Sequence, residues 1–382
     1  MLPGGRVPKT GRRWTGLGRT GGVTVGVGVV VCGSLLAACG GPPNATQPRS
    51  RAKTPTSVHP STSGPTVAPS TTAPATAPHR TAPARTAPPS TTQSAGGPPP
   101  PVPSSGAYLG AWVQPAGSRS PGAGSFASQM SSLPALQQSI SRPLAILHVY
   151  SGWSAPPPVA ALAAISANGS IPLLDWGCGV PDSAVASGTA DGLIRGYAEA
   201  LKAYGRPVLL RWFWEMNLLA SRPACRSAGG AADYVAAWQH IWTIFHEVGA
   251  SNVAFVWCPG ITGADPAPYY PGDGYVDWIG VDGYDRKGLG AAGFAALFSA
   301  FYAEWLPHGK PMMVAETGAR PAAQAAYLAG AAATMAGSTG WKALVYFDAA
   351  GPVASWTLSA GGLGAFGTLA MSQQFSPTLA NP

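Results

Sequence analysis

The alternation of short apolar runs with helix-like segments after residue 106 restricts the possible fold more than any other feature. Eight runs are typical of buried strands, at 108–113, 144–150, 171–176, 208–214, 253–258, 276–281, 311–315 and 344–347. Helix-like segments lie between several of them, at 189–204, 231–248, 293–305 and 322–336. Strands that alternate with helices pair in parallel through right-handed crossovers.

Eight such units in about 277 residues predict an α/β fold, the (β/α)8 or TIM barrel. A doubly wound open sheet is the alternative, but no glycine-rich turn follows the first strand, so the barrel is favoured. In such a barrel the carboxyl ends of all strands face one end of the molecule, here called the mouth, and functional residues gather there.

The net charge is divided unequally along the chain. Residues 1–105 contain ten Lys or Arg and no Asp or Glu, which gives +10, whereas the whole chain is +8 and residues 106–382 sum to −2. Nucleic-acid binding needs a basic surface on the folded part. The sequence therefore predicts no nucleic-acid partner for residues 106–382.

Residues 1–38 have the pattern of a lipoprotein signal peptide. A basic start precedes an apolar stretch of sixteen residues, 23–38, which is short for a membrane span and fits a signal-peptide core. The stretch ends in Leu-Ala-Ala-Cys, which resembles a bacterial lipobox and implies cleavage before Cys39 and lipidation of its thiol. An ordinary cleaved signal is the alternative, and Arg12-Arg13 leaves twin-arginine export open.

Residues 39–105 are predicted to form a disordered linker. They consist largely of Pro, Thr, Ser and Ala, so they cannot bury enough apolar surface to offset the entropy of ordering. We expect an exported protein on the outer face of the bacterial cell membrane, or released from it. Its lipid would be its only membrane contact, and the linker would hold the domain 106–382 away from the bilayer.

Three cysteines remain in the domain 106–382. Cys178 and Cys225 each follow a predicted strand at the same end of the fold, and a disulfide between them suits an oxidising compartment. Cys258 lies in an apolar run and is expected to be a buried thiol. No Cys/His spacing resembles a metal site, so no metal or cofactor is expected. Nothing in the sequence requires more than a monomer.

Two of the apolar runs end in a glutamate. Arg211 and Glu215 close the fourth run, and Glu316 closes the seventh. Because side chains alternate across a strand, we expect Arg211, Phe213 and Glu215 on one face if the strand continues that far. Two carboxylates at one barrel mouth are what double-displacement hydrolysis of a glycosidic bond requires. The alternative is that both glutamates are solvated loop residues.

Other polar and aromatic side chains lie at or just after the predicted strands. Sugar rings stack on aromatic side chains, although core packing explains any single tryptophan equally well, and His148 is explained equally well as a core histidine. Arg211 is placed to pair with the nucleophile, and Asp282 to bind a hydroxyl or an arginine. The candidates for substrate contact are Arg211, Trp214, Asn217, Tyr284, Asp282, Trp257, Trp176, His148 and Phe347.

Four segments together resemble glycoside hydrolase family 26: RWFWEMN at 211–217, WCP at 257–259, YPGDGYVDWIGVDGY at 270–284 and AETG at 315–318. The family is best known for endo-β-1,4-mannanases and belongs to a clan of retaining barrels. The resemblance implies that Glu215 is the acid/base, Glu316 the nucleophile and Tyr284 its support. Family members usually have His where this chain has Trp214, and a Gly and aromatic run where it has Leu218-Leu219-Ala220.

These observations predict a hydrolase, specifically a retaining endo-β-glycosidase that acts on a polysaccharide. The resemblance favours β-1,4-mannan, with β-1,3-xylan and mixed-linkage β-glucan as alternatives. Two other interpretations remain. One is a non-catalytic carbohydrate-binding barrel on the cell surface, against which the retention of both glutamates argues. The other is a lipoprotein that remodels the envelope polysaccharide of its own cell.

Overall fold

The domain is a closed barrel of eight parallel strands in the order β1 to β8, which confirms the predicted fold class. It is seen in a computed structural model that describes residues 96–115, 126–350 and 355–375. Residues 1–38, Cys39 and most of the predicted linker lie outside the described residues. The strands are β1 (Tyr108–Val113), β2 (Ile146–Ser151), β3 (Ile171–Trp176), β4 (Val208–Trp212), β5 (Val253–Trp257), β6 (Trp278–Asp285), β7 (Met312–Ala319) and β8 (Trp341–Asp348).

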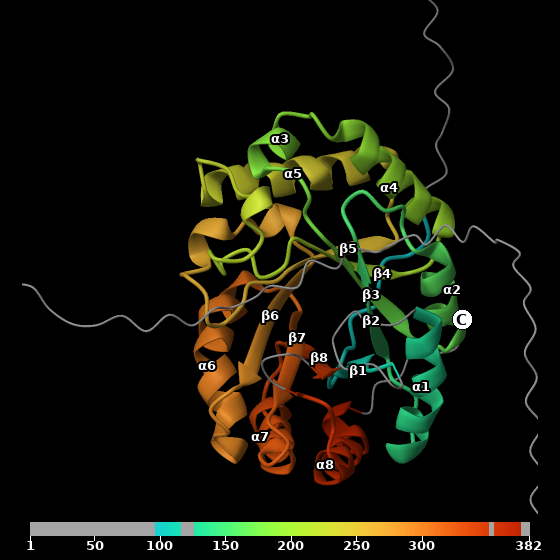
Figure 1. Ribbon diagram of the computed structural model, residues 1–382, viewed down its shortest axis with the longest axis vertical. Coiled ribbons are helices and arrows are strands. Elements are labelled where there is room, and N and C mark those ends of the chain that lie inside the picture. The colour runs from blue at the N-terminus through green and yellow to red at the C-terminus, as the bar shows by residue number, and fades with distance from the viewer. Residues whose placement is uncertain (1–95, 116–125, 351–354, 376–382) are drawn as a thin grey trace, which may run out of the picture. The chain divides into compact units, whose positions relative to one another are not determined.

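The helices surround the strands, as Figure 1 shows. They are α1 (Phe126–Ser139), α2 (Val159–Ala167), α3 (Asp182–Ala186), α4 (Asp191–Tyr204), α5 (Ala231–Val248), α6 (Gly293–Trp305), α7 (Gln324–Ala336) and α8 (Ala360–Ala370). Helices α1, α2, α3 and α8 were not predicted from the sequence. Helix α2 has no polar face, α8 is rich in glycine and α1 contains Pro134, so these three lack a clear helical pattern of apolar and polar residues. Helix α3 is only five residues long. Within the described ranges, no helix is long and apolar enough to cross a bilayer.

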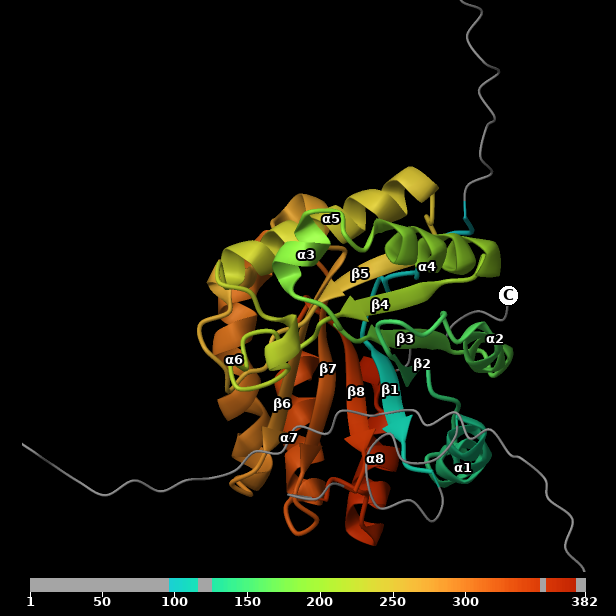
Figure 2. The same ribbon diagram turned by 45° about the horizontal axis from the view of Figure 1, so that its top comes forward.

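Alternation along the strands produces two apolar layers. The inner layer fills the barrel and contains side chains from the strands, among them Leu173, Leu209, Val256, Met313 and Val345. The outer layer packs the opposite strand faces against the helices. Figure 2 shows β7, β8 and β1 side by side in this wall. Because the interior is filled, the barrel is a packed scaffold with its polar residues at the strand ends.

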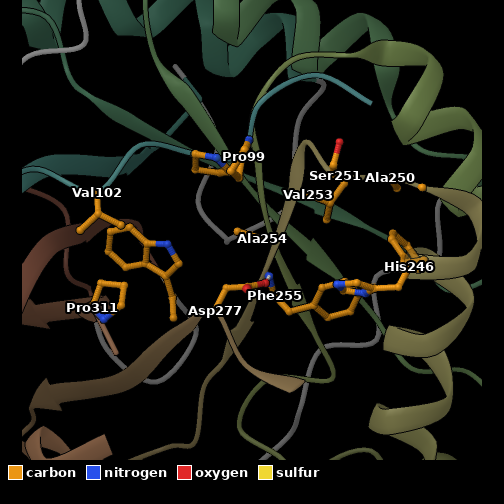
Figure 3. A pocket seen from close by; sticks show the side chains of 14 residues that line it. Pro99, Val102, His246, Ala250, Ser251, Val253, Ala254, Phe255, Asp277 and Pro311 are labelled. Atoms are coloured by element: carbon orange, nitrogen blue, oxygen red, sulfur yellow. Dashed lines mark hydrogen bonds between the residues drawn. The ribbon is translucent and has the colours of Figure 1, made fainter. Parts of the chain in front are cut away.

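The first described residues pack against the end of the barrel where the strands begin. Gly96 donates its backbone N–H to the carbonyl oxygen of Gly249 at 2.9 Å, and Pro100 is buried. A groove of about 440 Å³ lies here, lined by Pro99, Phe255, Trp278 and neighbouring residues (Figure 3). The last ten residues of the predicted linker therefore contact the barrel on the side opposite the mouth.

Candidate active site

The backbone leaves strand β4 in a tight turn that carries Glu215. Arg211, Phe213 and Glu215 were expected on one face only if the strand continued to Glu215, and this condition is not met, because β4 ends at Trp212. Phe213 and Glu215 have φ values of 41° and 54°, in the left-handed region. Phe213 packs outside the barrel, with its ring centroid 5.7 Å from that of Tyr234. Left-handed conformations are unfavourable for non-glycine residues and are often found at functional sites.

Arg211 is the centre of the polar residues at the mouth. Its Nε donates to Asp175 Oδ1 at 2.7 Å, and its Nη1 donates to both carboxylate oxygens of Asp282 at 2.7 Å. Its Nη2 donates to Asp175 Oδ2 and to Glu316 Oε1. Arg211, Asp175 and Asp282 are almost fully buried. The guanidinium therefore hydrogen-bonds carboxyl groups from β3, β6 and β7 at once.

A β-bulge in strand β7 directs Glu316 into this cluster. Val281 pairs with Val314, but the next residue, Asp282, pairs with Glu316, so Ala315 is the extra residue. A bulge changes the face on which the following side chain lies. Without it, Glu316 would share the outward face of Val314, because alternate residues share a face. The bulge thus places Glu316 next to Arg211.

Two tyrosines hold the Glu316 carboxylate together with Arg211. Tyr284 at the end of β6 donates its hydroxyl to Glu316 Oε2 at 2.5 Å, and Tyr150 at the end of β2 donates to Oε1 at 3.1 Å. Hydrogen bonds from three donors fix the orientation of this carboxyl group. Glu316 is therefore a positioned carboxylate with few free acceptor sites.

Glu215 lies in a different environment. Its carboxylate accepts no hydrogen bond from the described residues, while its backbone N–H donates to the carbonyl oxygen of Cys258 at 2.8 Å. Burial raises the pKa of Glu215 to about 7, and the nearby Glu316 carboxylate adds to the increase. The cations Arg222, Arg211 and Arg286 act in the opposite direction. The two glutamates therefore suit opposite roles, one as an ionised group and one as a proton donor.

Most of the candidate residues from the sequence lie at the mouth of the barrel, and three of them do not. Arg211, Asp282, Glu316, Tyr284 and His148 form one connected set, in which His148 Nε2 lies 2.7 Å from Asp175 Oδ2. Trp214 and Phe347 border this set, through contacts of the Trp214 ring with Tyr150 and of the Phe347 ring with Tyr284.

Trp176, Trp257 and Asn217 do not line the mouth. Trp176 is fully buried and stacks on Tyr197 of helix α4, and fully buried Trp257 packs on Trp305 of helix α6. Asn217 is buried as well, and its amide bonds the backbone of Gly260 and Ala264. These three side chains therefore hold the barrel and its loops together, and none of them is placed to contact a substrate.

Two residues of the cluster were missing from the sequence-based candidates. They are Tyr150 at the end of β2 and Asp175 at the end of β3. Burial alone would raise the pKa of Asp175, but Arg211 and His148 hold it below its ordinary value. The alternation of side chains along a strand could have indicated both residues. Tyr150 lies on the same strand face as His148, and Asp175 lies on the same strand face as Leu173.

The loop after β4 is fixed by a disulfide and by arginines. The structure forms the Cys178–Cys225 disulfide, with a Cα–Cα distance of 5.8 Å, between the loop after β3 and the short helix η1 (Pro223–Cys225). Arg226 Nη2 donates to the carbonyl oxygens of Met216 and Leu218 at 2.8 Å. This loop therefore has a defined shape beside Glu215.

One set of side chains has the donor types of a metal site. Ligand atoms of His148, Asp175 and Glu316 lie within 4.8 Å of one another. Arg211 Nη2, however, donates to both carboxylates of this set and lies 3.3 Å from His148 Nε2. A guanidinium already supplies the positive charge there, so these residues do not fit a metal ion.

Arg211 should be essential for stability as well as for the site. Replacing it in Arg211→Leu leaves buried carboxylates without a counter-charge, and we expect a loss of about 3–5 kcal/mol in the free energy of unfolding. Urea denaturation measures this loss. The control is Arg195→Leu, which removes an exposed pair with Glu247 at 2.9 Å and should cost less than about 1 kcal/mol. Equal losses in both variants would contradict the central role of Arg211.

Comparison with known proteins shows similarity to a family of glycoside hydrolases. Residues 191–315 match the model of glycosyl hydrolase family 26, a segment that includes Glu215 and ends one residue before Glu316. Endoglucanase H of Acetivibrio thermocellus is 31% identical over an alignment of 235 residues. The alignment covers 56% of this chain and 24% of that protein. The chain thus spans about a quarter of the length of this curated relative.

Solved structures share the fold at lower identity. A β-mannanase from a symbiotic protist of the termite Reticulitermes speratus is 19% identical with a TM-score of 0.52, covering 73% of this chain and 90% of that chain. BoMan26A, a family 26 β-mannanase from Bacteroides ovatus, is 14% identical with a TM-score of 0.52, covering 72% and 91%. A modular endo-β-1,4-mannanase from Cellulomonas fimi is 15% identical with a TM-score of 0.52, covering 72% and 73%. Identities this low show the fold alone. The match to the family model confirms the resemblance to glycoside hydrolase family 26.

Proposed function

We propose, from this family resemblance and from the geometry of the mouth, that the chain is a retaining endo-β-glycoside hydrolase. The observation that carries the proposal is the contrast between the two glutamates. Glu316 is hydrogen-bonded by Arg211, Tyr150 and Tyr284, whereas the Glu215 carboxyl accepts no hydrogen bond from the described residues and burial raises its pKa to about 7. A retaining mechanism needs one ionised nucleophile and one protonated acid.

The proposed reaction has two steps. In the first, Glu316 attacks the anomeric carbon while Glu215 gives its proton to the departing glycosidic oxygen, which leaves a covalent glycosyl ester on Glu316. In the second, Glu215 takes a proton from water, the water oxygen attacks the anomeric carbon, and the bond to Glu316 breaks. Arg211 and the two tyrosines keep the nucleophile oriented through both steps.

A β-linked polysaccharide is the proposed substrate, with β-1,4-mannan favoured. The support is the resemblance of the four sequence segments to a family known mainly for mannanases. A β-glucan is the main alternative, since the relative that aligns at 31% identity is named an endoglucanase. Tyr150 and Tyr284, which are partly buried and pack against the buried rings of Trp112, Phe347 and Trp356, offer surfaces for contact with a sugar ring.

Hydrolysis should depend on both glutamates in different ways. We expect the purified chain to release reducing ends from one of galactomannan, glucomannan, β-1,3-xylan or mixed-linkage glucan. Glu316→Gln should abolish release because it removes the nucleophile. Glu215→Gln should lower kcat by about 10²–10⁴-fold because it removes the proton donor.

The matched control is Glu304→Gln, which makes the same change on the exposed side of helix α6 and should leave the rate unchanged. Circular dichroism of each variant checks that it is folded. Binding of a polysaccharide without any release of reducing ends by the unmodified chain would instead indicate a non-catalytic barrel.

The rate should fall above about pH 7. The acid acts only when protonated, and Glu215 loses its proton as the pH rises through its pKa of about 7. The measurement is kcat/KM against pH. Arg222→Gln removes a cation that lowers this pKa, so the alkaline limb should move to higher pH, whereas Arg206→Gln at the other end of the barrel should not move it. A rate independent of pH between 6 and about 9 would contradict the role of Glu215.

Export and lipid anchoring through Cys39 are also proposed. The pattern of residues 1–39 supports this proposal, as does the Cys178–Cys225 disulfide, a type of bond that persists in oxidising compartments. In bacteria that express the full chain and are fed radioactive palmitate, we expect label on the chain and none on Cys39→Ser. Equal labelling of both would show that the lipid is not attached at Cys39.

A further inference from the structure

Two arginines from different loops lie on aromatic rings beside Glu215. The guanidinium carbon of Arg222, in the loop after β4, lies 4.0 Å from the centroid of the Trp214 ring. The guanidinium carbon of Arg286, just after β6, lies 5.6 Å from the ring centroids of Tyr284 and Trp356. Both cations interact electrostatically with the Glu215 carboxyl. Neither arginine was given a role in binding the substrate above.

Neither cation has a carboxylate partner in the part of the chain that the structure describes. The ion pairs within 4.0 Å there involve Arg195 and Arg211 but not Arg222 or Arg286. Arg222 is partly buried, yet its side chain makes one hydrogen bond, from Nη1 to the carbonyl oxygen of Trp214 at 2.7 Å. A guanidinium has five N–H donors. A partly buried cation such as Arg222, with unused donors, is costly unless an anion binds to it, whereas Arg286 is exposed to solvent.

The position of Arg222 is built into its loop. Its φ of 48° is left-handed, and Pro223 follows it, although the residue before a proline favours extended backbone. The disulfide at Cys225 and the bonds from Arg226 to Met216 and Leu218 hold this conformation. The loop therefore keeps a guanidinium beside the acid/base candidate at a cost in backbone energy.

We propose that the polysaccharide bound at this mouth carries an acidic group, such as a uronate carboxylate, on a sugar next to the cleaved bond. The inference rests on the proposed function for the position of that bond. A planar guanidinium on an aromatic face binds carboxylate through two parallel hydrogen bonds. The neighbouring ring faces can stack on the sugar itself. Neutral hydroxyl groups could use the donors but would add no negative charge beside the two cations.

The test compares matched ligands that differ only in charge. Oligosaccharides from glucomannan are used as such and after oxidation of their C6 hydroxyl groups to carboxylates, and calorimetry measures their binding to the full chain. We expect at least tenfold tighter binding of the oxidised form, with a smaller difference at high salt because ions screen the attraction. A C6-sulfated form shows whether a carboxylate or a sulfate is preferred, and preference for either supports the inference.

Variants assign the preference to the two arginines. Arg222→Gln and Arg286→Gln should each lose most of the preference, and Arg222→Lys should keep only part of it because it lacks the planar fork. The matched control is Arg206→Gln, an exposed arginine before β4 at the opposite end of the barrel, which should keep the preference. Circular dichroism confirms folding of each variant.

Two outcomes separate this inference from the proposed function. Equal or weaker binding of the charged oligosaccharides, or a preference that survives both substitutions to Gln, overturns the inference whether or not the chain hydrolyses a polysaccharide. A preference that depends on both arginines supports the inference even if no reducing ends are released, and in that case the proposed hydrolysis fails alone.

Discussion

The arrangement of the mouth depends on one buried guanidinium. Arg211 bonds Asp175, Asp282 and Glu316, which come from three different strands, so its charge permits these carboxylates to be buried together. Without a counter-charge such a cluster would be strongly destabilising. The same bonds place Glu316 and leave Glu215 outside the network. Charge compensation and the difference between the two glutamates therefore have a single physical origin.

Local irregularities of the backbone complete the arrangement. The bulge at Ala315 moves Glu316 to the inner face of β7, and left-handed residues after β4 turn Glu215 back towards the mouth. A regular β7 would place Glu316 on its outer face with Val314, because the faces of a strand alternate strictly. Such features cost free energy and are retained where the surrounding structure holds them. Here the disulfide, Arg226 and the bond from Glu215 N–H to Cys258 supply that restraint.

The loop after β4 distinguishes this chain from the family pattern that its motifs resemble. Trp214 stands where a histidine is usual, and Arg222 covers its ring. These two residues lie beside the proposed acid/base, where a change affects the substrate more than the reaction. The retained glutamates fit the family reaction, and the replaced loop fits a different substituent on the sugar. In the proposed function, the reaction and the substrate preference thus depend on different residues.

The sequence by itself determined the barrel and the two glutamates, because strand periodicity, strand number and the acids that close two runs are local properties of the chain. It also indicated the pairing of Cys178 with Cys225. It could not separate Trp176 and Trp257, which pack outward, from Trp214 at the mouth, since apolar composition does not show which way a residue faces at a strand end. Only the tertiary structure joined Asp175 to Arg211 and Tyr150 to Glu316, because these contacts link residues 36 and 166 positions apart. It also placed Arg222 near Glu215, because that proximity depends on the turn after β4.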